Sequence, residues 1–450
     1  MFDRTELRYL EHALQTLERG FAGLPDFQAG LETASLQALL QTVAERMQDN
    51  FPYPHPLYAG QMLKPPHPVA RLAYMLSMYI NPNNHALDGG RASSAMEKEA
   101  VAGIASMFGY KSHLGHLCAS GTIANLEALW VARHAQPRPQ VLASEQAHYT
   151  HARMCEVLQM PFRAVGVDEA GRMDMNALEA LLKQEAVGTV VATLGSTALG
   201  AVDPLHEILR LRERYGFRVH VDAAYGGYYT LVDNLGGAAR AAFDAMPRAD
   251  SIVVDPHKHG LQPYGCGCVL LRDPAEGRFY KHESPYTYFT SSELHLGEIS
   301  LECSRPGAAA VALWATQQLL PLQPGGEFAR SLETCRRAAL ALRQQLANGR
   351  AYLAGPVPEL DIVVWSMAAA NRSRASRLAQ QVFTAAAGRQ LHLALLQVPD
   401  RLASAWWPGL NGEPTAVTAL RSCLMKPEHS EWLPRILELL AAASSEVQSA

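Results

Sequence analysis

Long hydrophobic runs, clustered basic residues and paired cysteine motifs are all missing from this 450-residue sequence. No apolar run approaches the roughly 18 residues that cross a bilayer. Residues 1–6 are acidic and lack the apolar core of a secretion signal. We therefore expect no membrane association and a cytoplasmic location.

Excess charge of either sign is also lacking, since 39 basic and 43 acidic residues give a net charge of −4. The basic residues are scattered rather than gathered in a stripe or tail, so nucleic acid is not an expected partner. The seven cysteines are odd in number and include no Cys-x-x-Cys pair. This pattern predicts neither a disulfide framework nor a four-thiolate zinc site.

What the sequence does contain is a regular alternation of short apolar runs and segments with helical periodicity between about residues 100 and 272. Such alternation predicts an α/β fold with a mostly parallel sheet covered on both faces. The run at 265–271 follows the previous strand after a turn too short for a helical crossover, so it is predicted to be antiparallel. The predicted strands are 141–144, 189–195, 217–222 and 251–255, and the predicted helices are 122–134, 174–186 and 204–215.

Three domains are predicted from shifts along the chain. Residues 1–65 combine helical periodicity with a proline-rich extended stretch, in which prolines exclude helix. Residues 66–310 hold the alternating pattern. Residues 311–450 read as a smaller α/β domain, with a strand at 359–367 and a terminal helix at 431–443.

The segment Asp255-Pro256-His257-Lys258 follows a buried apolar run. Open α/β folds place their ligands at the carboxyl edge of the sheet, where Lys258 would lie. Taken alone, Lys258 is equally compatible with a solvated surface charge.

Two further strand ends carry polar groups suited to a phosphorylated ring. Asp222 closes the run Val219-His220-Val221 and precedes small residues, so a cationic ring nitrogen could pair with it. The alternative is an ordinary helix cap. The segment Ser120-Gly121-Thr122 opens a predicted helix, where amide donors suit a phosphate. The alternative here is again a capped helix without a ligand.

His148 follows the strand at 141–144, and Thr197 follows the strand at 189–195. Both would face the same edge of the sheet as Lys258. With these motifs the sequence resembles the pyridoxal 5′-phosphate-dependent amino acid decarboxylases of group II, related to glutamate, aromatic amino acid and tyrosine decarboxylases, which have fold type I. The resemblance covers about residues 50–310.

This resemblance implies pyridoxal 5′-phosphate as the cofactor, with Lys258 as the Schiff-base lysine and Asp222 as the partner of the ring nitrogen. His148 is implied to stack on the ring. Thr197 is implied to lie near the ring hydroxyl. The remaining implied cofactor contacts are Ser120, Gly121, Thr122, Ala224, Asp255 and His257.

The implied reaction is loss of CO2 from an amino acid to give the amine. Tyr288, in a predicted loop, is the expected proton donor beside the catalytic residues Lys258, His148 and Asp222. The alternative is that Tyr286 and Tyr288 only pack within this loop or close it over the site. A homodimer is also implied, with segment 280–305 as the crossing loop. The expected substrate contacts are Tyr58, Gln61 and Arg305.

Two rival interpretations stay open at this point. One is a different reaction of the same cofactor, such as transamination or carbon–carbon lyase chemistry. The other is a non-catalytic protein that binds the cofactor, or a metal through His257 and His259. His-x-His alone is weak support for a metal, and no metal site is predicted.

Overall fold

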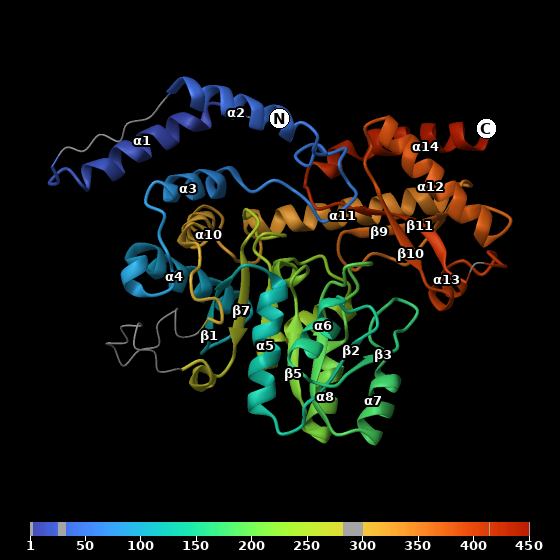
Figure 1. The fold of residues 1–450 in the computed structure, drawn as a ribbon. Coiled ribbons are helices and arrows are strands. Elements are labelled where there is room, and N and C mark those ends of the chain that lie inside the picture. The colour runs from blue at the N-terminus through green and yellow to red at the C-terminus, as the bar shows by residue number, and fades with distance from the viewer. Residues whose placement is uncertain (1–2, 26–32, 282–299, 414, 450) are drawn as a thin grey trace.

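The apolar, β-branched runs of the sequence form the strands of a large sheet, as β4 (Val187–Thr193) illustrates with every residue buried. The structure is a computed structural model, and it describes residues 3–25, 33–281, 300–413 and 415–449. Figure 1 shows this sheet beneath a second, smaller one that carries the C-terminal part of the chain.

The large sheet has the strand order β1-β7-β6-β5-β4-β2-β3. Its strands are parallel except at β7, which is antiparallel to both β1 and β6. The prediction of a mostly parallel sheet with an antiparallel strand near 265–271 is therefore confirmed. The other strands of this sheet are β1 (Leu114–Cys118), β2 (Gln140–Ser144), β3 (Phe162–Val165), β5 (Arg218–Asp222), β6 (Ser251–Val254) and β7 (Gly267–Leu271).

Helices cover both faces of the large sheet because alternate strand residues point to opposite sides. Val141, Ala143 and Val191 pack toward the side of α5 and α6. Their neighbours Leu142 and Val190 pack into the core on the other side, with α4, α7, α8 and α9. These helices are α4 (Arg91–Met107), α5 (Gly121–Ala135), α6 (Thr150–Val157), α7 (Met175–Gln184), α8 (Leu205–Tyr215) and α9 (Gly237–Asp244).

The second sheet is antiparallel and has the order β10-β11-β9-β8. One face packs against α11, α12 and α14, and the other against α13 and the loops of the large sheet. Its elements are α11 (Glu327–Asn348), β8 (Tyr352–Ala354), β9 (Ile362–Met367), α12 (Arg372–Gly388), β10 (Ala394–Val398), α13 (Asp400–Trp406), β11 (Val417–Cys423) and α14 (His429–Ser449).

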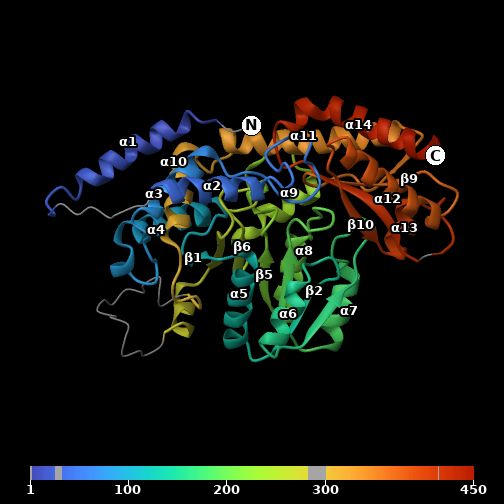
Figure 2. The same ribbon diagram turned by 45° about the horizontal axis from the view of Figure 1, so that its top comes forward.

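The N-terminal helices lie at the outer edge of the molecule, and Figure 2 shows them from a second direction. They are α1 (Glu6–Arg19), α2 (Thr33–Met47) and α3 (Pro68–Met78). Helix α10 (Gly307–Leu319), which contains the predicted domain boundary at 310, packs against α3 and α4. The division into three domains stays a prediction. No helix within the described ranges is long and apolar enough to cross a membrane.

Short 3-10 helices complete the chain at Leu87–Gly89, Gly227–Leu231, Met246–Arg248 and Pro274–Phe279. The parallel strands β2, β4, β5 and β6 all end at the same edge of the large sheet. Polar side chains that follow these four strands are thereby brought together.

Candidate active site

Lys258 lies in the tight turn that follows β6, close to the carboxylate of Asp255. Its Nζ is 3.0 Å from Asp255 Oδ2, and its backbone N–H donates to the Asp255 carbonyl over 2.9 Å. His257 Nε2 is 3.5 Å from the same carboxylate oxygen. Burial lowers the pKa of His257. The turn therefore presents one amine whose counterion lies three residues before it in the chain.

The N-terminus of α5 faces this turn. Ser120 caps the helix by accepting a 3.4 Å hydrogen bond from the Ile123 N–H. The amides of Gly121 and Thr122 belong to the first turn and have no acceptor within the helix, so they can bind an anion. A Cβ atom on Gly121 would lie 2.7 Å from the Asp255 carboxylate oxygens. A larger residue at position 121 would therefore displace the Asp255 carboxylate from its place beside Lys258.

Asp222 is the last residue of β5, and three donors within the described part of the chain hold its carboxylate. His151 Nε2 lies 2.8 Å from Oδ2, the Asn125 amide donates to Oδ2 over 3.4 Å, and the Ala224 N–H donates to Oδ1 over 3.1 Å. A carboxylate accepts about four hydrogen bonds, so one acceptor position stays available to a ligand.

The electrostatic setting keeps Asp222 ionised. Burial raises the pKa of its carboxyl, but the hydrogen bond and charge of His151 and the charge of Lys258 outweigh burial. The pKa of Asp222 therefore lies well below its ordinary value. A buried carboxylate of this kind can stabilise a cationic partner such as a protonated ring nitrogen.

Asn125 is itself oriented by a chain of buried polar side chains. His220 Nε2 lies 2.8 Å from Asn125 Oδ1, and His220 Nδ1 lies 2.9 Å from the Ser251 hydroxyl. Burial lowers the pKa of His220 to about 3, so its imidazole is neutral. The chain fixes the Asn125 amide with its N–H side toward Asp222.

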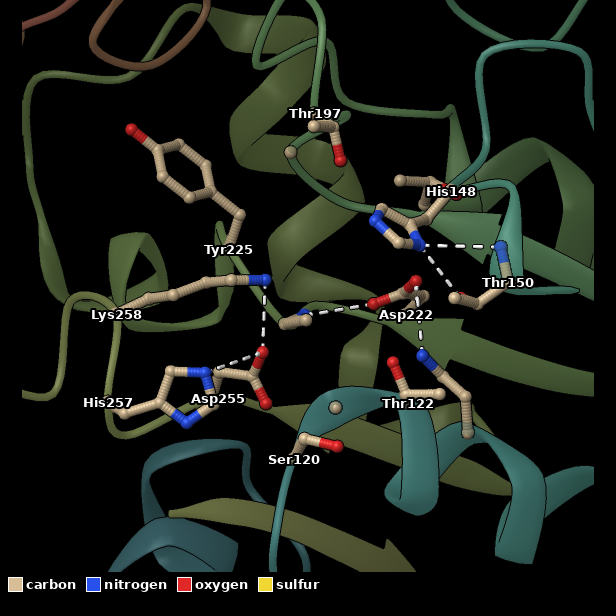
Figure 3. Close-up of a pocket in the computed structure, with 15 residues that line it drawn as sticks. Ser120, Thr122, His148, Thr150, Thr197, Asp222, Tyr225, Asp255, His257 and Lys258 are labelled. Carbon is tan, nitrogen blue, oxygen red and sulfur yellow. Dashed lines mark hydrogen bonds and ion pairs between the residues drawn. The ribbon is translucent and has the colours of Figure 1, made fainter. Parts of the chain in front are cut away.

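His148 occupies the loop between β2 and α6, on the side of the site opposite Lys258 (Figure 3). Its Nδ1 lies 2.7 Å from the Thr150 hydroxyl and accepts from the Thr150 N–H over 3.4 Å. The acceptor role assigns the ring proton to Nε2. Burial lowers the pKa of His148, so a neutral, flat imidazole faces the site.

Thr197 and Tyr225 form the wall on the side of the second sheet. Between β4 and Thr197 the chain turns at Gly195, whose φ of +101° favours glycine. The Tyr225 hydroxyl donates to Asp361 over 2.6 Å. Tyr225 is thereby tied to the residue that directly precedes β9 of the second sheet.

These groups enclose a cavity of about 190 Å³. Figure 3 shows Asp222 between His148 and Lys258, with Ser120 and Thr122 at the α5 end. All the residues predicted to contact the cofactor line this cavity: Ser120, Gly121, Thr122, His148, Thr197, Asp222, Ala224, Asp255, His257 and Lys258. Residues that also line it without having been predicted are Asn125, Thr150, Thr193, Gly195 and Tyr225.

The structure does not bring the predicted substrate residues to the cavity wall. Arg305 is buried, and its guanidinium binds the Glu97 carboxylate at 2.6 Å and the Leu117 carbonyl at 2.8 Å. This ion pair leaves Arg305 with a role in holding the core rather than a substrate.

Tyr58 and Gln61 also lie outside the cavity wall. The Tyr58 carbonyl accepts a 2.7 Å hydrogen bond from Lys426. Gln61 accepts from Arg421 over 3.1 Å, and Arg421 in turn donates to the Thr197 carbonyl over 2.6 Å. Gln61 thus reaches the site only through Arg421. Tyr288 lies outside the described residues.

His151, behind the cavity wall, is a further residue that the sequence did not indicate. It is fully buried behind Asp222, three positions after His148, in the first turn of α6. No local pattern singles it out, because its partner Asp222 lies 71 positions away.

The residues present suit a phosphorylated pyridine aldehyde. An amine, a neutral imidazole face, an ionised carboxylate and a helix N-terminus converge on one cavity. The remaining acceptor position of Asp222 and the first-turn amides of α5 are the groups that such a molecule would use.

Residues 55–352 match the family model described as the pyridoxal-dependent decarboxylase conserved domain. The L-tyrosine decarboxylase of Enterococcus faecium is 28% identical, with 68% of this chain and 68% of that protein covered. A probable L-tyrosine/L-aspartate decarboxylase of Methanospirillum hungatei is 32% identical, with 65% of this chain and 75% of that protein covered. The L-2,4-diaminobutyrate decarboxylase of Acinetobacter baumannii is 29% identical, with 65% and 64% covered.

Solved structures share the fold over nearly the whole chain. Mouse CSAD superposes with a TM-score of 0.77 at 22% identity, covering 96% of this chain and 91% of that one. Oryza sativa TDC, solved with PLP and tryptamine, gives a TM-score of 0.78 at 16% identity and covers 99% of each chain. The fold is accordingly that of the fold type I decarboxylases.

Proposed function

The chain belongs to the pyridoxal-dependent decarboxylase family and is a pyridoxal 5′-phosphate-dependent amino acid decarboxylase, and we propose that its active site is the cavity around Lys258. One observation carries this proposal: Lys258, Asp222 and His148 come from three separate segments and line one cavity. The reaction is conversion of an amino acid to its amine and CO2.

Lys258 is proposed to hold the cofactor covalently as a Schiff base. Asp255 Oδ2, 3.0 Å from Nζ, would hold the Lys258 amine in place toward the cofactor. The α5 N-terminus would bind the phosphate through the amides of Gly121 and Thr122 and the hydroxyls of Ser120 and Thr122.

Asp222 would hold the ring nitrogen in its protonated form through its remaining acceptor position. When bound, pyridoxal 5′-phosphate supplies an electron-withdrawing ring that accepts the electrons released as CO2 departs. Asp222 must be ionised before substrate arrives, and the three donors on its carboxylate secure this state. Such preorganised charge stabilises a transition state without reorganisation cost during the reaction.

His148 is proposed to lie against one face of the ring. Thr150 holds its imidazole by Nδ1, so the ring plane is fixed before ligand binds. A neutral flat group in this position excludes water from that face while adding no charge. His148 Nε2–H is then free to donate to a substrate oxygen.

Tyr288 is proposed to protonate the substrate carbon after CO2 is lost. The proposal rests on the sequence, since segment 283–292 combines loop composition with two tyrosines. Delivery of the proton to the substrate carbon gives the amine, whereas delivery to the cofactor gives a carbonyl product. Tyr286 is the alternative donor in the same segment.

A cytoplasmic homodimer is proposed as the working unit. All seven cysteines are free thiols, as expected in a reducing compartment. Helices α1 and α2 carry large apolar side chains, among them Tyr9, Leu39 and Met47, that are 61–71% exposed. Exposed apolar surface of this kind favours association with a second copy. Sedimentation that finds a fully active monomer would rule the dimer out.

The experiment that tests the proposed function is a substrate screen. The purified protein, loaded with pyridoxal 5′-phosphate, would be incubated with each of the common amino acids and with 2,4-diaminobutyrate. The expected result is release of CO2 with an equal amount of amine from at least one of them. Keto acid formation without CO2 would instead indicate transamination.

A further inference from the structure

His151 makes the shortest hydrogen bond to Asp222, yet it does not line the cavity. Its Nε2 is 2.8 Å from Asp222 Oδ2, and its side chain is fully buried. No ligand in the cavity could touch this imidazole directly. Any effect of His151 on the reaction must therefore pass through the Asp222 carboxylate.

The donor role of His151 follows from its surroundings. Among the described residues, its Nδ1 has no hydrogen-bond partner although it is buried. An ionised carboxylate only accepts hydrogen bonds, so the proton shared over the 2.8 Å contact is carried by Nε2. His151 therefore donates to Asp222 through Nε2.

We propose that His151 is a positioning residue that fixes the orientation and the charge of Asp222 toward the cofactor ring nitrogen. This inference rests on the proposed role of Asp222. The neutral Asn125 amide donates to the same oxygen, but at 3.4 Å it is the longer and weaker bond. His151 is accordingly the main donor holding Oδ2.

The His151 hydrogen bond shifts the pKa of Asp222 in one direction, downward. Burial raises the pKa of Asp222, and the His151 hydrogen bond is the largest influence that lowers it. Without this bond, Asp222 would begin to protonate at a higher pH and cease to offer a full negative charge. The other titratable side chains near Asp222 are Lys258, His148, His220 and Asp255.

The chain allows a matched pair of variants. In His151→Gln the amide nitrogen can reach the position of Nε2 and donate to Asp222. In His151→Asn the side chain is shorter and cannot reach it. Both variants are neutral amides in the same helix turn, so they differ chiefly in the donor at the Nε2 position. His12→Asn, the same substitution at an exposed position in α1, is the control.

The readout is the affinity of the apo-protein for pyridoxal 5′-phosphate, measured without substrate at several pH values between 5.5 and 8. Binding is monitored through the absorbance of the cofactor. His151→Asn should weaken binding by about tenfold to a hundredfold, the value of a hydrogen bond to a charged group. The loss should grow toward low pH. His151→Gln should recover most of the affinity, and His12→Asn should match the unmodified protein.

Binding unchanged in both His151 variants, or weakened equally in both, would overturn the inference. Asp222→Asn, measured alongside, tests the proposed role of Asp222 separately from that of His151. If Asp222→Asn binds and absorbs like the unmodified protein, the proposed role of Asp222 is wrong. If only His151→Asn behaves like the unmodified protein, the role of Asp222 stands and that of His151 is wrong.

Discussion

The amine of Lys258 lies 3.0 Å from the carboxylate of Asp255, three residues earlier in the same turn. The pair sits at the carboxyl edge of the parallel strands, where the N-terminus of α5 also points. One short turn therefore supplies both the nucleophile and the carboxylate that orients it. Different variants test what the buried polar groups do for catalysis and what they do for folding stability.

Asp222→Asn should still accept cofactor at saturating concentration, although with lower affinity, and should lose most of its turnover. A neutral amide cannot hold the ring nitrogen protonated, and loss of preorganised charge of this kind costs about a hundredfold to a thousandfold in rate. Steady-state assay of amine formation with saturating cofactor measures the effect. Turnover within a factor of about two of the unmodified protein would remove the electrostatic role of Asp222.

Tyr288→Phe should still consume substrate and release CO2, because proton delivery follows the loss of CO2. The product should shift from amine toward carbonyl compound, and activity should decline as aminated cofactor accumulates. Product analysis by mass spectrometry during turnover measures the shift, with Tyr286→Phe in parallel. Amine formed at the normal rate without inactivation would transfer the role to Tyr286 or His148.

Arg305→Met should destabilise the protein without changing KM. The variant leaves the buried Glu97 carboxylate without its cation, at a cost of about 3–5 kcal/mol in the free energy of unfolding. Arg248→Met, which breaks an exposed ion pair with Glu213, should cost no more than about 1 kcal/mol. Urea denaturation measures both. A raised KM with unchanged stability would restore the substrate role expected from the sequence.

Folding stability should fall as the pH drops below about 6.5. Burial lowers the pKa of His220 and of His429 to about 3, so between pH 6.5 and 3 the unfolded chain binds more protons than the folded one. Over this range, each of the two histidines lowers the free energy of unfolding by about 1.4 kcal/mol for every unit by which the pH falls. Urea denaturation of apo-protein at pH 7.5 and 5.5 measures this loss.

His429→Asn is the matched variant for this effect. His429 Nδ1 accepts the Lys426 N–H over 3.2 Å, and the asparagine oxygen can replace that acceptor. Between pH 7.5 and 5.5, the free energy of unfolding of the variant should fall by about 1 kcal/mol less than that of the unmodified protein. Equal losses in both proteins would show that His429 titrates normally in the folded state.

The large sheet could be predicted from the sequence because its strands are short apolar runs between well-marked helices. Strand β11 could not, since it contains Thr418, Arg421 and Ser422 although every residue is buried. Arg421 and Ser422 find acceptors far along the chain, at the Thr197 and Ala59 carbonyls. The hydrophobic periodicity of the β11 segment does not indicate acceptors that lie so far away in the chain.

The cavity wall was predictable for a similar reason, because strand ends in parallel sheets meet at one edge. His151 was missed because it becomes relevant only through its contact with Asp222, 71 positions away. The ion pair of Arg305 could not be predicted either, because its partner Glu97 lies 208 positions away. Both outcomes depend on tertiary pairing rather than on local pattern.

The most direct test of the central claim is to locate the residue that binds the cofactor covalently. The protein loaded with pyridoxal 5′-phosphate would be reduced with borohydride, digested and mapped by mass spectrometry, with Lys258→Ala as the control. The expected result is a single pyridoxyl label on Lys258, absent from the variant. A label on Lys64, Lys111 or Lys281, or one that persists in Lys258→Ala, would contradict the assignment of this cavity as the active site.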